Sequence, residues 1–288
     1  MRIVFMGTPD FAVASLNALV NAGHEVAAVI TQPDRPKGRG NKLAFPEVKE
    51  RALELGLPVH QPDSVKDEAF LELLKGYHPD VIVVVAFGRI LPQSVLNFPK
   101  YGCVNVHGSL LPQYRGAAPI QRAVLDGLKE TGVTTMRMDI GMDTGDMILK
   151  EEIGIGPNET TGELWGRLAK IGGELLVKTL EQIDNGTAPR IPQNDDFSMA
   201  PMLDKGISKI DWNNKTAIEI KNLIRGLDPI MGTYSYLNGK KIKIWKVDID
   251  EDDKSDIENG TVIKADSKEG LYIKARNGII KVLEIQVE

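Results

Sequence analysis

The chain has 288 residues, of which 42% are hydrophobic and 26% are charged, and its formal net charge is −5. These fractions are ordinary for a globular protein, and no run reaches the ~20 consecutive apolar residues that a membrane-spanning helix requires. The negative charge excludes nucleic-acid binding by the chain as a whole, so such a partner would need local basic patches. A single cysteine excludes an internal disulfide, and the first residues lack the pattern of a signal peptide. We therefore expect a cytoplasmic protein with no membrane partner.

The first half of the chain alternates short apolar runs with segments of helical periodicity. The apolar runs predict strands at residues 2–7, 25–31, 80–88 and 102–107, and the periodic segments predict helices at residues 11–23, 46–56 and 68–77. Because the runs are apolar on both faces, we expect a parallel sheet covered by helices on both sides. In the first strand-to-helix turn, Thr8 is the predicted N-cap and Pro9 the first helical residue. That turn lacks the G-x-G-x-x-G pattern, which argues against a dinucleotide cofactor.

The pattern changes after a long amphipathic helix predicted at about residues 161–183. Residues 187–206 are polar and rich in Pro and Asn, as expected of a linker. A helix at residues 215–227 follows, and then several short strands, two of them joined at Asn238-Gly239, a strong hairpin signal. Such strands suggest a small barrel of the oligonucleotide-binding (OB) kind. We therefore predict an α/β, Rossmann-like parallel-sheet domain of residues 1–186, a linker of residues 187–206 and a smaller OB-like β-barrel domain of residues 207–288.

Two polar residues close the apolar run at 102–107. Side chains alternate along a strand, so Asn105 and His107 point to the same side. They lie at the carboxyl end of a strand, where parallel sheets place ligands. On this segment alone a structural histidine, with both ring nitrogens hydrogen-bonded, is the more frequent alternative. Cys103 shares the parity of Asn105 and His107, but an apolar strand residue of this kind is most often a packing residue.

A second polar segment is the glycine-punctuated loop that contains Asp139, Asp143 and Asp146 between two apolar strands. A calcium loop of the helix-loop-helix kind needs Gly at its sixth position and Glu at its twelfth. Counted from Asp139, these positions hold Thr144 and Lys150, so this reading is excluded and we predict no metal. A surface turn carboxylate remains the alternative for Asp146.

Together these segments resemble the methionyl-tRNA formyltransferase family, one of the formyltransferases that use 10-formyltetrahydrofolate. The likeness rests on "GTPDF", "TQPDRPKGRG", "NVHGSLLPQYRGAAPIQ" and "DIGMDTGD", and it continues to about Leu283. It implies a Rossmann-like formyltransferase domain with a catalytic trio of Asn105, His107 and Asp143. It also implies that the folate site is formed by Ser109, Leu110, Leu111, Pro112, Phe87, Gly88, Ile90, Leu91 and Asp139.

The implied reaction needs these residue types. An amine attacks the formyl carbon, and the carbonyl oxygen becomes an oxyanion that Asn105 and a protonated His107 can stabilise by donating hydrogen bonds. Asp143 can hold the His107 ring in its charged form and can take the proton of the attacking amine as a general base. The resemblance implies 10-formyltetrahydrofolate as the formyl donor and initiator methionyl-tRNA as the acceptor, and we expect the enzyme to be a monomer.

Basic residues gather at two places that we expect to contact tRNA. The segment from residue 35 to residue 42 carries four basic residues and no acidic one, namely Arg35, Lys37, Arg39 and Lys42. It has no periodicity of a packed element, and by composition alone it fits a disordered surface loop. The resemblance implies that this loop inserts against the tRNA acceptor end, where Arg39 would be the main contact. The second place is the predicted hairpin, where Lys241 and Lys243 share a face; a lysine-protected strand edge is the alternative there.

Two other classes of function stay open. An enzyme of the same chemistry would act on a small amine, either an amino-sugar nucleotide or glycinamide ribonucleotide. An enzyme that acts on glycinamide ribonucleotide is expected to have a glycine-rich phosphate-binding turn after the first strand, and "GTPDF" is not such a turn. A non-catalytic nucleic-acid-binding protein has no use for Asn105, His107 and Asp143 together. The amino-sugar nucleotide is therefore the main rival of methionyl-tRNA as the acceptor.

Overall fold

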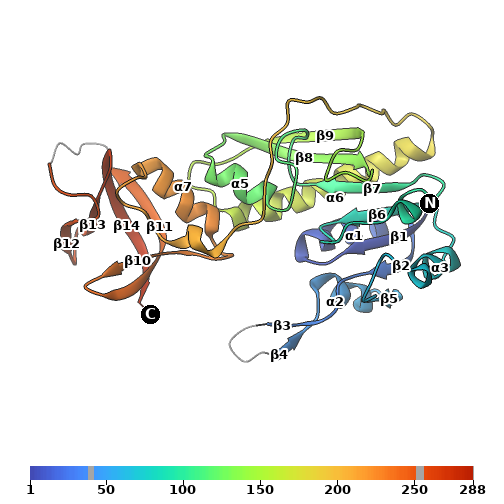
Figure 1. Cartoon of the computed structure of the whole chain (residues 1–288), viewed down its shortest axis with the longest axis horizontal. Helices are drawn as coiled ribbons and strands as arrows, with labels where there is room; N and C mark the ends of the chain where they lie inside the picture. The colour runs from blue at the N-terminus through green and yellow to red at the C-terminus, as the bar shows by residue number, and fades with distance from the viewer. Residues whose placement is uncertain (38–41, 251–255, 288) are drawn as a thin grey trace. The chain divides into compact units, whose positions relative to one another are not determined.

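The computed structural model describes residues 1–37, 42–250 and 256–287. The chain forms two compact units (Figure 1). The first unit holds residues 1–117, 132–153 and 166–200, and the second holds residues 118–131, 154–165 and 201–288. The chain therefore enters the second unit twice before its C-terminal part. The division into a domain of residues 1–186, a linker of residues 187–206 and a domain of residues 207–288 stays a prediction.

Within the described ranges, the first unit contains one sheet of seven strands in the order β5-β2-β1-β6-β7-β8-β9 (Figure 1). The strands are β1 (Arg2–Gly7), β2 (Glu25–Ile30), β5 (Val59–His60), β6 (Val81–Val85), β7 (Cys103–His107), β8 (Glu130–Arg137) and β9 (Met147–Gly154). The pairs from β5 to β7 are parallel, as predicted. β8 is antiparallel to β7, so the prediction of a parallel sheet is wrong at this edge. The antiparallel direction of β8 follows from the path of the chain, because β8 enters the sheet at the end where β7 leaves it. Thr134 lies opposite His107 in this pairing.

The predicted helices of the first unit are confirmed. They are α1 (Asp10–Asn21), α2 (Glu47–Glu54), α3 (Glu68–Gly76) and α6 (Thr161–Asp184), with the short α4 (Gln93–Leu96) in addition. All five residues of β6 and all five of β7 are buried, which explains why these strands are apolar on both faces. One core cluster joins β1, β2 and β6 to α3 through Met6, Ile30, Val84, Phe70 and Leu74. The sheet therefore gives the polar ends of its strands a rigid support.

The turn after β1 differs from its prediction. α1 begins at Asp10 with Pro9 as its N-cap residue, so Thr8 as N-cap and Pro9 as first helical residue are both wrong. The Thr8 hydroxyl donates instead to the carbonyl of Phe87, 3.2 Å away. Gly7 leaves no room for a side chain, because a Cβ there would lie 2.7 Å from that of Ala12. The turn is thus packed against the turn after β6.

The basic segment is a small hairpin where the sequence predicts no regular element. β3 (Arg35–Lys37) and β4 (Lys42–Ala44) pair antiparallel. Each strand has three residues, which is too short for alternation to be recognised in a sequence. The predicted tRNA contact Arg39 lies outside the described residues.

The second unit contains α5 (Pro119–Leu125), the 3-10 helix η1 (Lys205–Ser208) and α7 (Ala217–Leu227). In its described part, five strands form an antiparallel sheet in the order β10-β11-β14-β13-β12. They are β10 (Thr233–Leu237), β11 (Lys240–Asp250), β12 (Val262–Asp266), β13 (Gly270–Ala275) and β14 (Gly278–Val287). α7 packs its apolar face against this sheet, which confirms the smaller β domain. The hairpin at Asn238-Gly239 is also confirmed, since both residues have positive φ, 49° and 76°.

No helix within the ranges that the structure describes is long and apolar enough to cross a membrane.

Candidate functional site

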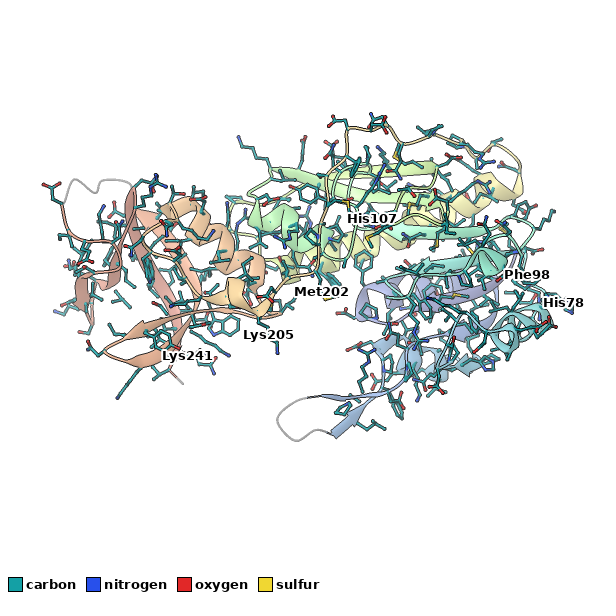
Figure 2. The ribbon with its side chains drawn as sticks, viewed as in Figure 1. His78, Phe98, His107, Met202, Lys205 and Lys241 are labelled. Atoms are coloured by element: carbon teal, nitrogen blue, oxygen red, sulfur yellow. The ribbon has the colours of Figure 1, made fainter. Side chains whose placement is uncertain are left out.

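Three of the predicted residues meet at the carboxyl end of β7 in the first unit. Asn105 and His107 close this strand, and His107 is labelled in Figure 2. Asp143 comes from the loop between β8 and β9, and its Oδ2 lies 3.7 Å from His107 Nδ1. Asn105 and His107 are only 8% and 6% exposed. Their equal parity on the strand directs both side chains to the same face of the sheet.

The two ring nitrogens of His107 have different surroundings. Nε2 lies 2.9 Å from the carbonyl oxygen of Tyr114, and since a carbonyl only accepts, Nε2 carries hydrogen and donates. Nδ1 faces Asp143 at a distance longer than a hydrogen bond. A purely structural histidine would have both nitrogens hydrogen-bonded, whereas here Nε2 is fixed by Tyr114 and Nδ1 faces the Asp143 carboxylate without a hydrogen bond to it.

The backbone of Asp143 is held in an uncommon conformation. Its φ of 55° lies in the left-handed region, which Asp tolerates better than most residues. Oδ2 of Asp143 accepts a hydrogen bond from the backbone N–H of Gly116 at 2.8 Å. A Cβ on the nearby Gly145 would fall 1.7 Å from the Arg137 carbonyl oxygen, so the loop requires glycine there. The carboxylate is thus directed at His107 by its own loop and by the segment that follows β7.

Two residues that were not predicted from the sequence, Arg115 and Gln193, fix this geometry. Gln193 donates from Nε2 to the carbonyl oxygens of Asp143 and Gly145, both at 2.8 Å. Its Oε1 accepts from Arg115 Nε at 2.9 Å. Arg115 itself is 8% exposed, and its guanidinium lies 4.5 Å from the ring centroid of Phe197.

Arg115 and Gln193 therefore tie together the two segments that hold His107 and Asp143. Arg115 stands in the chain between Tyr114, which accepts from His107, and Gly116, which donates to Asp143. Gln193 lies in the stretch predicted to be a linker. Its role has no signal in a single sequence, because a polar residue in an aperiodic segment looks the same whether it is solvated or bonded.

The Asn105 amide is a candidate donor to a ligand. Among the residues that the structure describes, this side chain has no hydrogen-bond partner. The amide is not among the fully buried unpaired atoms of the described residues, so it stays accessible and can donate to the oxygen of a bound ligand.

The residues predicted to line the folate site fall into two groups. Ser109 and Leu111 are fully buried; the Ser109 hydroxyl donates to the Gln113 carbonyl at 2.6 Å, and Leu111 packs on Met136 and Met147. These two shape the segment from inside, while Leu110 and Pro112 are half-buried.

The second group lies after β6 and after β8. Phe87 and Leu91 are 2% exposed and belong to the core, whereas Ile90 is 68% exposed and Gly88 has a φ of 77°. Asp139 accepts from Gly141 N and Thr144 Oγ1 at 3.0 and 2.6 Å, so it shapes its own loop. That loop also exposes Ile140 and Met142. Exposed apolar side chains around a few fixed polar groups are typical of sites for flat organic ligands.

The remaining polar candidates have ordinary structural roles. Cys103 is 2% exposed, and burial raises the pKa of its thiol to about 12, so a thiolate nucleophile is excluded and the packing role is confirmed. Asp146 accepts from Arg190 Nε at 3.0 Å at the surface. In residues 1–37, 42–250 and 256–287, no group of three or more His, Cys, Asp or Glu is arranged to hold a metal ion.

The predicted tRNA contacts belong to two surfaces. In the first unit, Arg35 is exposed at the start of β3, and Lys37 and Lys42 pair through their backbones in the hairpin. In the second unit, Lys241 and Lys243 lie opposite Tyr236 and Tyr234 on the β10–β11 hairpin, where Figure 2 labels Lys241.

Cations and aromatic rings alternate on this second surface. The Lys241 ammonium lies 4.6 Å from the Tyr234 ring centroid, and that of Lys243 lies 5.7 Å from the ring of Trp245. Tyr236 is 56% exposed. Such a combination suits phosphates and unpaired bases of a nucleic acid.

The chain resembles known proteins over its whole length. The family described as "Formyl transferase" matches residues 1–180, and "Formyl transferase, C-terminal domain" matches residues 202–288. The chain is 49% identical to a methionyl-tRNA formyltransferase of Lachnospira eligens, covering 100% of this chain and 92% of that protein. It is 50% identical to one of Alkaliphilus metalliredigens, covering 99% and 90%.

Two solved structures share the fold. HypX from Aquifex aeolicus in complex with tetrahydrofolic acid matches with a TM-score of 0.68 and 19% identity, covering 100% of this chain and 44% of that chain. An N-formyltransferase from Helicobacter canadensis in complex with folinic acid and dTDP-3-aminofucose matches with a TM-score of 0.67 and 22% identity, covering 97% and 98%.

Proposed function

Because this chain belongs to the formyl transferase family, we propose that it transfers the formyl group of 10-formyltetrahydrofolate to the free amino group of methionyl-tRNA. The product, formylmethionyl-tRNA, serves translation initiation. The observation that carries the reaction type is the His107–Asp143 pair at 3.7 Å, with His107 fixed through Nε2 and open at Nδ1. The acceptor follows from relatives about half identical over nearly their full length.

The trio divides the chemistry of the transfer. The amine nitrogen attacks the formyl carbon, the bond from that carbon to the folate nitrogen breaks, and a proton passes from the amine to the folate. Asn105 and His107 Nδ1–H donate to the oxyanion as it forms, and donors fixed in this way are usually the largest single contribution to the rate. Asp143 takes the proton of the attacking amine, directly or through a water molecule, as the general base.

The two substrates use different parts of the chain in this proposal. The pterin of the folate lies between the turn after β6 and the loop after β8, against Phe87, Gly88, Ile90, Leu91 and Asp139. The segment from Ser109 to Pro112 lines the same site. The acceptor end of the tRNA contacts the β3–β4 hairpin, and the Lys241–Lys243 surface binds its phosphates. The enzyme acts in the cytoplasm as a monomer.

The test offers two acceptors side by side. The purified chain receives 10-formyltetrahydrofolate with methionyl-tRNA in one reaction and with an amino-sugar nucleotide in another. We expect formylation of methionyl-tRNA with a kcat/KM at least about a hundredfold higher, a difference of about 2.7 kcal/mol between the two transition states. Preferential transfer to the sugar nucleotide would overturn the acceptor, and no transfer to any amine would overturn the reaction type.

A further inference from the structure

The side chain of Gln32 joins two segments that the proposed function assigns to different substrates. Its Nε2 donates to the carbonyl oxygens of Phe87 and Gly88 at 2.9 and 3.3 Å. Its Oε1 accepts from Arg35 Nη2 at 2.7 Å. Phe87 and Gly88 form the turn proposed to border the pterin, and Arg35 begins the hairpin proposed to meet the tRNA. One amide thus uses its donors on the folate side and its acceptor on the tRNA side.

The turn after β6 depends on this amide for its shape. Gly88 has a φ of +77°, and a Cβ there would lie 2.7 Å from Gln32 Nε2, so the glycine backbone packs directly against the side chain. Ala86 also has a positive φ, 46°. The Phe87 carbonyl accepts a second hydrogen bond, from the Thr8 hydroxyl at 3.2 Å. An uncommon backbone persists only where its surroundings hold it, and here Thr8 and Gln32 hold it from two sides.

The backbone around Gln32 is fixed independently of its side chain. Gln61 Nε2 donates to the Gln32 carbonyl at 2.8 Å and to Asp34 Oδ1 at 2.7 Å. Lys49 Nζ forms an ion pair with Asp34 at 2.7 Å and also donates to Gln61 Oε1 at 2.8 Å. The hydrogen bonds of Lys49 and Gln61 lower the pKa of the Asp34 carboxyl. The base of the hairpin is therefore fixed by contacts in which the Gln32 side chain takes no part.

A pocket of about 310 Å³ lies between the same two segments. Arg35, Pro36 and Ala44 line it from the hairpin, Phe87 and Gly88 from the turn, and Gln32 belongs to its wall. A ligand that restrains the hairpin at this pocket therefore acts next to the turn that borders the folate.

We propose that Gln32 is a positioning residue that couples the binding of the two substrates. This inference rests on the proposed function. A phosphate bound to the exposed guanidinium of Arg35 holds it in place, and Arg35 then holds the Gln32 acceptor. The amide is thereby ordered with its donors on Phe87 and Gly88, and hydrogen bonds in such a chain strengthen one another. Folate then binds a turn that is already ordered, so its affinity rises, and by linkage the tRNA gains the same factor.

The coupling is measured by titrating tetrahydrofolate in the absence and presence of saturating uncharged tRNA, which cannot accept a formyl group. For the unmodified chain we expect tetrahydrofolate to bind at least about fivefold more tightly with tRNA, the lower end of usual coupling factors. Gln32→Leu lacks the donors and the acceptor, and should bring the ratio to about one. Gln32→Glu keeps an oxygen for Arg35 but turns a second oxygen toward the two carbonyls, and should also bring it to about one.

Gln61→Leu is the matched control. It loses hydrogen bonds at the same hairpin base but none to Phe87 or Gly88, so it should lower the Tm and keep the ratio. A ratio of one in the unmodified chain would overturn the coupling, as would a normal ratio in Gln32→Leu. Equal loss in Gln32→Leu and Gln61→Leu would assign the effect to the loop base and also overturn it.

Thermal unfolding shows whether each variant is folded. If Gln32→Leu does not fold, the ratio measured with Gln32→Glu decides whether the coupling depends on this amide. Formyl transfer by the unmodified chain is measured in the same preparation. Transfer to methionyl-tRNA with a ratio of one would refute the coupling alone, whereas absent transfer would refute the proposed function.

Discussion

Removal of the Asp143 charge, with its shape retained, tests the proposed trio. In Asp143→Asn the side-chain oxygen can still accept from Gly116 N, so the main change is one negative charge lost 3.7 Å from His107 Nδ1. At that distance the interaction of two unit charges is about 1 kcal/mol in water and about 4.5 kcal/mol at an effective dielectric constant of about 20. The side chains of His107 and Asp143 are 7% and 18% exposed, which favours the larger value.

We therefore expect kcat/KM for formyl transfer to methionyl-tRNA to fall by about a hundred- to a thousandfold, since about 1.4 kcal/mol corresponds to a factor of ten. The free energy of unfolding should change by about 1 kcal/mol or less, as for a typical single hydrogen bond. His107→Ala and Asp143→Ala should lose at least as much activity. The assay is steady-state formyl transfer, with a tetrahydrofolate titration and a thermal melt on each variant.

Asp146→Asn is the matched control in the same loop. Asp146 pairs with Arg190 at the surface, so its variant should keep kcat/KM within about twofold, as expected for an exposed ion pair. If Asp143→Asn kept more than a tenth of the activity, less than about 1.4 kcal/mol of transition-state stabilisation would be lost and the role of the carboxylate would be refuted. An equal loss in both variants would show damage to the loop instead of the loss of one charge.

Four further changes test other parts of the structure. Gln193→Leu removes both hydrogen bonds that this side chain donates to the Asp143 loop. We expect kcat to fall about ten- to a hundredfold with the tetrahydrofolate affinity nearly unchanged. A loss of tetrahydrofolate affinity without a loss of kcat would refute the positioning role. Arg39→Ala should impair transfer to methionyl-tRNA strongly and leave the tetrahydrofolate affinity unchanged. Arg39→Lys should recover only part of the activity, because an ammonium lacks the planar, forked donors of a guanidinium. Normal kinetics in Arg39→Ala would exclude Arg39 from tRNA recognition. Replacing Lys241 and Lys243 by Ala should reduce the slope of log K against log salt for tRNA binding by about 1–2, and an unchanged slope would assign them to a protected strand edge. Burial, together with Glu284 and Glu163, raises the pKa of Asp228, so the folded state binds this proton more tightly than the unfolded state. Stability therefore falls as pH rises from the unfolded pKa through the raised folded pKa. Asp228→Asn should stabilise the chain more at pH 7 than at pH 4 in urea titrations, and an equal effect at both pH values would contradict this.

The parts of the fold with strong local signals were predictable. β6 and β7 are uninterrupted apolar runs because both of their faces are buried, and Asn238-Gly239 has the positive φ angles that its hairpin needs. The pairing of His107 with a later Asp could be expected because the two segments resemble a known family. Burial of Cys103 also agrees with its apolar strand.

The parts that could not be predicted depend on contacts between distant segments. Thr8 has the residue type of an N-cap, yet its hydroxyl bonds to Phe87 across 79 positions of the chain. Gln32 and Gln193 are polar residues in aperiodic stretches, and only the folded structure shows that their amides hold the turns of the proposed site. The direction of β8 follows from the path of the chain between two units, which local periodicity does not contain.

The proposed reaction is formylation of the amino group of methionyl-tRNA by the trio at the end of β7. The most direct measurement incubates the unmodified chain and His107→Ala with formyl-labelled 10-formyltetrahydrofolate and methionyl-tRNA, and then identifies the labelled amino acid released from the tRNA. We expect N-formylmethionine from the unmodified chain and at least about a hundredfold less per unit time from His107→Ala, the size of effect expected when one oxyanion donor is lost. Label that stays on folate with the unmodified chain, or equal labelling by the two proteins, would contradict it.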